Sequence, residues 1–199
     1  ATDSSVIFPV FEKLVITRCP KVASFPLSPV LKDLRLVGYY LEVECLRDIP
    51  RLPTSLEILW IQCFGGLVAL PSNLGDLAKL SYLVVYSCMA LKGLPDGMDG
   101  LTSLRILQIT CCPAIEEFPN GLLQRLSALD SLTIFGCPEL ERRCREGGEY
   151  FQHLSPIPCK RGFRTGAPEV EAESTIIAPE AGTSRKKFLR SLLCSLEVR

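Results

Sequence analysis

The stretch Leu80–Pro95, LSYLVVYSCMALKGLP, has a spacing of apolar residues that recurs along most of the chain. Offsets 0, 3, 5, 8, 11 and 14 of this stretch are occupied by Leu80, Leu83, Val85, Cys88, Leu91 and Leu94. Offsets 3 and 5 have the two-residue period of a strand, whereas the later steps of three suit neither a long strand nor an α-helix. We therefore expect a short strand, a turn, and a return on the other side of a flat coil.

The same spacing starts again at residues 11, 31, 56, 104 and 129, so the units begin 20 to 25 residues apart. One unit cannot fold alone, because fixing about 24 backbones costs at least about 24 kcal/mol and burying six such side chains contributes roughly 9–18 kcal/mol. The units must stack. The period predicts an α/β fold, a leucine-rich repeat solenoid of about six repeats, with short parallel strands on the concave face and irregular or short-helical convex segments. It also predicts one file of buried leucines, formed by Leu59, Leu83, Leu107 and Leu132.

The pattern divides the chain into four parts. Residues 1–10 are expected to be the remnant of a preceding repeat, residues 11–143 the repeats, residues 144–161 a C-terminal cap, and residues 162–199 a mostly disordered tail. The last stretch, residues 186–199, is compatible with a short amphipathic helix. The incomplete first unit predicts that the chain is the C-terminal piece of a longer one. Asn73 and Asp96 stand where convex helical turns would need N-caps.

Composition argues against several classes of function. Lys and Arg number 22 and Asp and Glu also number 22, so the chain lacks the positive excess that nucleic-acid binding needs. No apolar run approaches the roughly 20 residues of a membrane span, so no integral membrane segment is expected. No CxxC pair occurs and His153 is the single histidine, so no metal site is expected. The absence of N-x-[ST] sequons together with this cysteine usage favours a reducing, cytoplasmic compartment.

Four cysteines share offset 8, where each strand turns into its return: Cys19, Cys88, Cys112 and Cys137. In stacked coils they would form a column with about 4.8 Å between neighbours. That distance permits disulfides, but parallel side chains at equivalent positions usually point the same way. We interpret the column as a ladder of small buried thiols.

Residues between the buried leucines are expected to point outward, onto the concave face. Trp60, Tyr82 and Tyr86 would lie there on adjacent strands, with Arg35 one strand away. Aromatic residues and arginine are typical of interface hot spots. The candidate protein-binding residues are Arg35, Trp60, Gln62, Tyr82, Tyr86, Gln108 and Phe135. The alternative is that this patch packs against an irregular insertion, residues 37–55, or against the rest of a larger chain.

Three segments carry a family resemblance: LVITRCPKVASFP, LTSLRILQITCCPAIEEFP and LDSLTIFGCPELERRCREGGEYFQHLSPIP. They resemble the end of the leucine-rich repeat region of plant nucleotide-binding, leucine-rich-repeat disease resistance proteins, the coiled-coil class of cereals in particular. The family's closing motif is matched by Cys137-Pro138-Glu139-Leu140, Cys144, Gly147-Gly148-Glu149 and Ile157-Pro158. Tyr150-Phe151 replaces the family's Asp-Trp. The resemblance covers about residues 11–160.

This resemblance implies a non-catalytic protein-recognition module of an intracellular plant immune receptor. Its partners would be a pathogen effector, the nucleotide-binding domain of the same receptor, or both, and the module would restrain the nucleotide switch. The chain contains no G-x-x-x-x-G-K-[ST] sequence for phosphate binding. No cofactor is therefore expected in this chain, and ADP or ATP would bind in a separate nucleotide-binding domain.

Two other classes of function remain open. One is a leucine-rich-repeat adaptor of another intracellular complex, such as a substrate-selecting ubiquitin ligase subunit. The other is a thiol-dependent enzyme, because Cys144, Cys159 and His153 are near one another in sequence. No orienting partner or oxyanion motif accompanies these residues, so we expect no enzyme.

Overall fold

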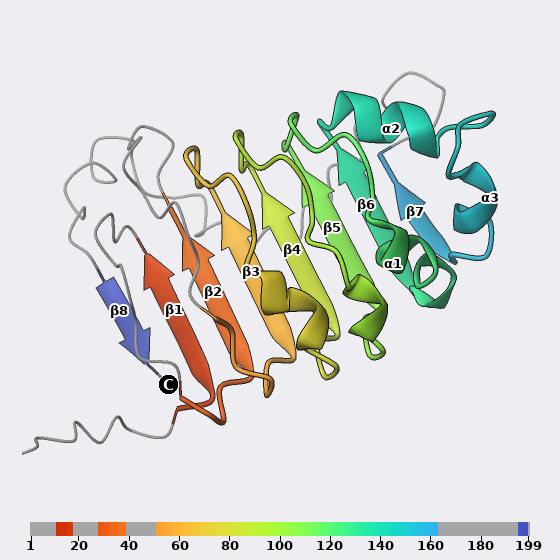
Figure 1. The fold of residues 1–199 in the computed structure, drawn as a ribbon. Coiled ribbons are helices and arrows are strands. Elements are labelled where there is room, and N and C mark those ends of the chain that lie inside the picture. Colours follow the sequence, from red (N-terminus) through yellow and green to blue (C-terminus); the bar gives the residue numbers. More distant parts are fainter. Residues whose placement is uncertain (1–10, 18–27, 39–50, 163–194, 199) are drawn as a thin grey trace, which may run out of the picture.

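The computed structural model describes residues 11–17, 28–38, 51–162 and 195–198. The chain is α/β, and its strands form one eight-stranded sheet in the order β7-β6-β5-β4-β3-β2-β1-β8 (Figure 1). Strands β1 to β7 are parallel, and β8 is antiparallel to β1. The strands are β1 Lys13–Thr17, β2 Asp33–Val37, β3 Ile58–Gln62, β4 Tyr82–Tyr86, β5 Ile106–Thr110, β6 Ser131–Phe135, β7 Cys159–Arg161 and β8 Ser195–Val198.

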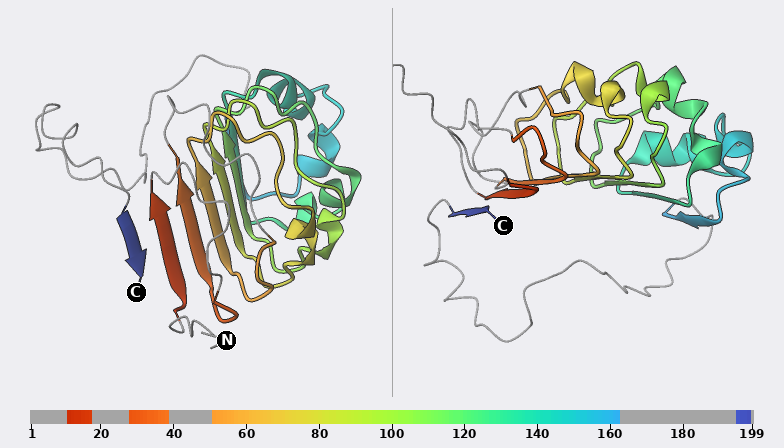
Figure 2. Two further views of the ribbon diagram at one scale, coloured as in Figure 1. Left: turned by 60° about the vertical axis from the view of Figure 1, so that its left-hand side comes forward. Right: turned by 90° about the horizontal axis from the view of Figure 1, so that it is seen from below.

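The sheet forms one wall of the molecule, and turns and short helices form the opposite wall (Figure 2). Strands that follow one another in the sequence from β1 to β7 are neighbours in the sheet, so each return leads back to the next parallel strand. This arrangement is compatible with a solenoid. The helices are η1 Ser72–Asp76, η2 Met98–Gly100, α1 Asn120–Leu123, η3 Leu126–Ala128, α2 Pro138–Cys144 and α3 Phe151–Leu154.

The core lies between the two walls, and its leucines are aligned. The strand register pairs Leu59 with Leu83, Leu83 with Leu107, and Leu107 with Leu132. All four side chains are fully buried. The register therefore confirms the predicted single file, because side chains at equivalent positions of parallel strands point to the same face.

The backbone turns sharply where β3, β4, β5 and β6 end. Cys63, Ser87 and Cys111 follow β3, β4 and β5, and they have φ angles of 61°, 55° and 54°. Gly136 holds the same place after β6, with φ of 69°. The amide of Cys111 donates a hydrogen bond to the carbonyl of Phe135 at 2.7 Å. These left-handed residues direct the chain from the sheet into the return, and the amides of Cys63, Ser87 and Cys111 each donate a hydrogen bond to the next coil.

Glycines allow the returns to pack backbone against backbone on the convex wall. A Cβ added to Gly75 in η1 would overlap the carbonyl oxygen of Gly97, immediately before η2. A Cβ added to Gly100 would overlap the carbonyl oxygen of Gly75. Neither position has room for a side chain, so close stacking of these coils depends on glycine.

The predicted N-caps of the convex turns are wrong. Pro71 and Gly97 occupy the N-cap positions of η1 and η2, with no side-chain capping bond. Asn73 lies inside η1 and is buried. Its Nδ2 donates to the Leu52 carbonyl at 2.8 Å, and its Oδ1 accepts from the Leu52 amide at 3.1 Å. Asn73 therefore fixes the segment that precedes β3 to the next coil, which satisfies two buried backbone groups.

The C-terminal end of the repeats extends the sheet. The region predicted as a cap, residues 144–161, includes α3 and ends in β7, which adds a seventh parallel strand beside β6. Helix α2 begins earlier, at Pro138, and provides the return after β6. The predicted cap thus adds one further coil, with its own parallel strand, to the repeats.

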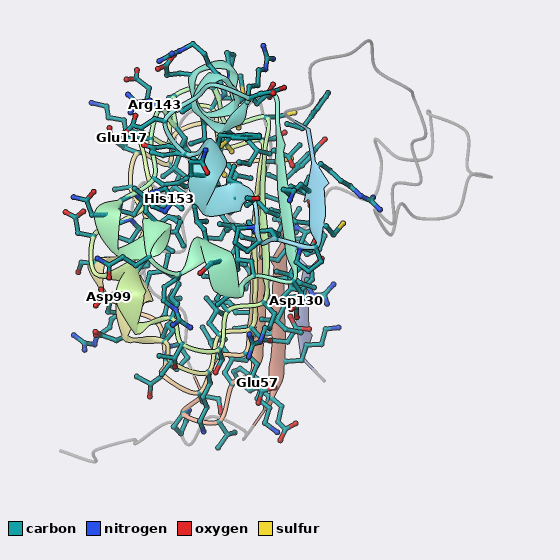
Figure 3. The ribbon with its side chains drawn as sticks, turned by 90° about the vertical axis from the view of Figure 1, so that its right-hand side faces the viewer. Glu57, Asp99, Glu117, Asp130, Arg143 and His153 are labelled. Carbon is teal, nitrogen blue, oxygen red and sulfur yellow. The ribbon has the colours of Figure 1, made fainter. Side chains whose placement is uncertain are left out.

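Arg143 on α2 joins the parts of this terminal region (Figure 3). Its guanidinium forms ion pairs with Glu149 at 2.9 Å, with Glu139 at 3.2 Å and with Glu117 at 3.6 Å. Its Cζ also lies 5.9 Å from the ring centroid of Tyr150. The repeat pattern requires an apolar residue at this position, and the buried Tyr150 ring provides apolar cover instead.

The last described residues correct a further expectation. Ser195–Val198 form strand β8, which pairs antiparallel with β1 and aligns Leu196 with Ile16 and Val198 with Leu14 (Figure 1). For these four residues the structure has a strand in place of the short helix with which the sequence of residues 186–199 is compatible. The edge of β1 offers unpaired backbone donors and acceptors, and a strand satisfies them where a helix would not. The expectations for residues 1–10, for Cys19, for most of the insertion and for the rest of the tail lie outside the described residues.

No helix in the described ranges is both long and apolar enough to cross a membrane.

Candidate protein-binding face

The face of the sheet that points away from the core carries three rows of residues, and we call it the concave face. Register pairing defines a central row, which consists of Val15, Arg35, Trp60, Val84, Gln108, Thr133 and Arg161 from β1 to β7. The row nearer the N-terminal strand ends consists of Lys13, Asp33, Ile58, Tyr82, Ile106, Ser131 and Cys159. The row nearer the C-terminal strand ends consists of Thr17, Val37, Gln62, Tyr86, Thr110 and Phe135. The structure places all seven candidate binding residues on this face.

Trp60 is held by polar contacts with its neighbours. The Arg35 Cζ lies 5.7 Å from the centroid of the Trp60 ring, within the range of a cation–π interaction. The indole Nε1 donates a hydrogen bond to Gln62 Oε1 at 3.1 Å. The ring orientation is thus fixed before any partner binds, which lowers the entropy that binding costs.

Arg35 is in turn held by an acidic neighbour. Its Nε donates to Asp33 Oδ1 at 3.0 Å, and its Nη2 donates to Asp33 Oδ2 at 3.2 Å. The Lys13 Nζ lies 3.6 Å from the same carboxylate. Two nitrogens of Arg35 are therefore engaged within the chain, and Asp33 offsets part of the positive charge at this end of the face.

Val84 is buried although it lies on the concave face. Only 3% of it is exposed, and β4 departs from strict alternation for this reason. Trp60 and Gln108 are its register partners, and Tyr82 and Tyr86 are two residues away on its own strand. A valine with these large side chains around it is shielded from water, so Trp60, Tyr82 and Tyr86 flank one apolar base, and we call these three residues the aromatic cluster. The sequence pattern did not reveal this burial, because alternation predicts an outward residue there.

The concave face carries no charged residue from β3 to β6. The residues in question are Ile58, Trp60, Gln62, Tyr82, Val84, Tyr86, Ile106, Gln108, Thr110, Ser131, Thr133 and Phe135. Phe135 is 57% exposed, a large fraction for an aromatic residue. Charge depletion and aromatic enrichment are the composition of an interface core.

Arg161 is a concave-face residue that sequence reasoning missed. Its position was assigned to the cap, but the pairing of Thr133 with Arg161 in β7 puts it at the end of the central row. It is exposed, and the ion pairs found among the described residues do not include it. The Cys-Lys-Arg tripeptide alone is too short to reveal a strand; only its contact with β6 does so.

The cysteine column lies just beyond the strand ends. Cys88, Cys112 and Cys137 are free and fully buried. Their thiols donate to the carbonyls two residues back, Cys88 to Tyr86 at 3.7 Å, Cys112 to Thr110 at 3.4 Å and Cys137 to Phe135 at 3.6 Å. These hydrogen bonds give the carbonyls at the strand ends a donor, so the buried thiols stabilise the ends of β4, β5 and β6. Cys19 lies outside the described residues.

The surroundings of Cys112, Cys137 and Cys144 keep these three thiols protonated, whereas a hydrogen bond with Cys112 lowers the pKa of the buried Cys88. A hydrogen bond with Cys88, together with burial, raises the pKa of Cys112. Burial raises the pKa of Cys137 to about 12 and that of Cys144 to about 12. A thiolate nucleophile requires a lowered pKa. In addition, Cys144 is buried whereas His153 on α3 is exposed. These features favour a structural role for Cys144.

In the described part of the chain, no group of three or more His, Cys, Asp or Glu side chains is arranged to hold a metal ion. No protein-family model matches this chain, and no curated protein matches it.

Proposed function

We propose that this chain is a non-catalytic protein-recognition module, a leucine-rich repeat solenoid of about six repeats, and that its concave face binds a protein. The observation that carries this proposal is the aromatic cluster of Trp60, Tyr82 and Tyr86, which lies beside Arg35 on an uncharged part of the sheet. Tryptophan, tyrosine and arginine are the residues most enriched in interface hot spots.

The surroundings of this cluster suit a binding role. The side chains stand on strands whose inward residues are fully buried, so the backbone that carries them is fixed. The cation–π contact and the hydrogen bond to Gln62 hold Trp60 in one orientation. A partner that covers the cluster gains the burial of aromatic surface and loses little side-chain entropy in this chain.

The resemblance to plant nucleotide-binding, leucine-rich-repeat proteins supports the biological part of the proposal. The chain would be part of a cytoplasmic immune receptor in plant defence, and the concave face would hold the nucleotide-binding domain in its closed state. A pathogen effector would compete for this contact or rearrange it. Such a switch needs a difference in affinity between two receptor states. The nucleotide-binding domain, rather than this chain, would bind ADP or ATP.

A binding measurement with two variants tests this proposal. Trp60 is the single tryptophan of the chain, so its fluorescence reports directly on the concave face. Adding the nucleotide-binding domain encoded by the same transcript should change this fluorescence in a saturable way. Trp60→Ala, followed by calorimetry, should weaken binding by about 30-fold or more, equivalent to about 2 kcal/mol. Trp60→Phe should retain part of the affinity.

One control variant and two contradicting outcomes make the result decisive. Lys79→Glu changes an exposed residue before β4, outside the concave face, and should bind normally. A transcript without a P-loop sequence upstream of this module would contradict the receptor assignment. A folded Trp60→Ala protein with unchanged affinity would contradict the assignment of the binding face.

A further inference from the structure

We propose that the concave face binds an extended, largely uncharged segment of its partner, which crosses the strands along the central row and places one carboxylate opposite Arg161. This inference rests on the proposed function and adds the chemistry and direction of the bound segment. The charge distribution along the central row and the spacing of its strands determine both.

The middle of the bound segment must be uncharged. No residue of the concave face from β3 to β6 carries a charge that would compensate a buried ion. A charged partner side chain placed there would lose its water without gaining an opposite charge, which is unfavourable. Apolar and aromatic side chains suit Trp60 and Phe135, and the side chains of Gln108 and Thr133 offer hydrogen-bonding groups for amides and hydroxyls.

The two arginines of the central row differ in their availability. Arg35 donates from two nitrogens to Asp33, so its carboxylate partner is already present in the chain. Arg161 is exposed, and no ion pair among the described residues includes it. An Arg–carboxylate pair is among the stronger polar contacts, because both members are charged and the hydrogen bonds are bidentate. A partner carboxylate is therefore expected at the β7 end of the row and not beside Arg35 on β2.

The strand spacing fixes the distance between the two anchors. Trp60 on β3 and Arg161 on β7 are separated by four strand steps, or about 19 Å at about 4.8 Å per step. An extended segment rises about 3.3 Å per residue. The residue that contacts Trp60 and the acidic residue should therefore be about six positions apart in the partner sequence.

Parallel selections from a random peptide library test this inference on the full chain. A phage library of random peptides of about 12 residues would be selected on the wild-type chain and, separately, on Arg161→Glu. Wild-type binders should be neutral in the middle and enriched in Asp or Glu about six positions from an apolar or aromatic residue. Binders of Arg161→Glu should lose this enrichment and gain Lys or Arg at the same place.

Synthetic peptides from the wild-type selection give the quantitative test. Their affinity should fall about tenfold on Arg161→Glu, as expected when one exposed ion pair is replaced by repulsion. It should fall less on Arg161→Gln and stay unchanged on Lys79→Glu. High salt should weaken binding to the wild type but not to Arg161→Gln. Circular dichroism and Trp60 fluorescence would show that each variant is folded.

The outcomes separate this inference from the proposed function. Peptides that need Trp60 but show no acidic preference, or bind Arg161→Glu equally well, would overturn the inference and leave the binding face intact. A selection in which no peptide depends on Trp60 would overturn both. Peptides that need Trp60 and exchange an acidic for a basic residue between the two selections would support both.

Discussion

Arg35 covers one face of the Trp60 ring, with its Cζ 5.7 Å from the ring centroid, and is itself held by Asp33. The contact joins neighbouring strands β2 and β3 through side chains as well as through the backbone. The rest of the indole ring surface stays accessible to a binding partner. The contact therefore contributes both to stability and to the orientation of the principal binding residue.

Removing Arg35 should expose this ring. Arg35→Ala should lower the free energy of unfolding by about 0.5–1 kcal/mol, the range for an exposed cation–π contact. It should also increase quenching of the fluorescence of Trp60, the single tryptophan, by acrylamide. Arg51→Ala is a matched control, because Arg51 is exposed and pairs with Asp76 away from the sheet. Equal quenching in Arg35→Ala and the wild type would show that the guanidinium does not cover the ring.

The convex wall should tolerate no side chain at Gly75. Gly75→Ala would force a Cβ against the Gly97 carbonyl, and separating the two returns should cost about 1–3 kcal/mol or more. Gly93→Ala is the control, because an added Cβ there meets no atom within 4 Å. That variant should be neutral or stabilise the fold by about 0.4–1 kcal/mol, through the unfolded state. Urea denaturation measures both, and similar midpoints for the two variants would contradict the close packing.

The free energy of unfolding should fall in alkaline solution, because a buried thiol stays protonated in the folded chain while it ionises in the unfolded chain. The pKa of Cys144 is about 12 in the folded chain because of burial, against about 8.5 for an exposed thiol. Below pH 8.5 the thiol is protonated in both states, so its full contribution to the free energy of unfolding is present. Between pH 8.5 and 12 only the unfolded state releases the proton, so the free energy of unfolding falls by up to about 1.4 kcal/mol per pH unit.

Urea denaturation at pH 8 and pH 10 checks this expectation, with Cys144→Ala as the comparison. The variant should start less stable, because it loses a buried side chain, but its stability should depend less steeply on pH. Identical pH dependence in the two proteins would show that this thiol ionises equally easily in both states.

The terminal region should depend on Arg143 more than on its neighbour Arg142. Arg143 pairs with Glu117, Glu139 and Glu149, and its side chain is 22% exposed. Arg142 pairs with Glu139, and its side chain is 66% exposed. Arg143→Ala should therefore accelerate amide hydrogen exchange in α2 and α3 clearly, and Arg142→Ala only slightly. Equal exchange rates in the two variants would argue against Arg143 as the joining residue.

Strand β8 should protect the edge of β1. Leu196→Pro removes a backbone donor from the middle of β8, so amides of β1 should exchange faster with solvent while those of β4 and β5 keep their rates. Leu196→Val keeps this backbone donor and serves as the control. Unchanged exchange in β1 with Leu196→Pro would mean that β8 does not cover this edge in solution.

The repeat spacing was enough to predict the parallel strands and their register. Leu83 and Leu107 occupy equivalent positions of consecutive units, and a chain that stacks such units must align them to bury both. The same alternation put Trp60 and Tyr82 on the outward face. The family resemblance and the receptor function stay predictions.

Other features required knowledge of contacts between distant residues. Alternation predicted that Val84 would be outward, and it is, but large neighbours bury it. Asn73 has the side chain of an N-cap, yet its amide bonds to Leu52 instead. Such choices depend on which neighbours another coil brings near, and a local pattern does not contain that information.

The sequence by itself determined the coil, because a period of 20 to 25 residues places apolar side chains where only stacking buries them. The tertiary structure alone decided how the ends of the sheet are completed, by β7 with Arg161 on one side and by β8 on the other. The physical reason is that an edge strand offers hydrogen-bonding groups to any segment within reach. Which segment meets that edge depends on the path of the whole chain.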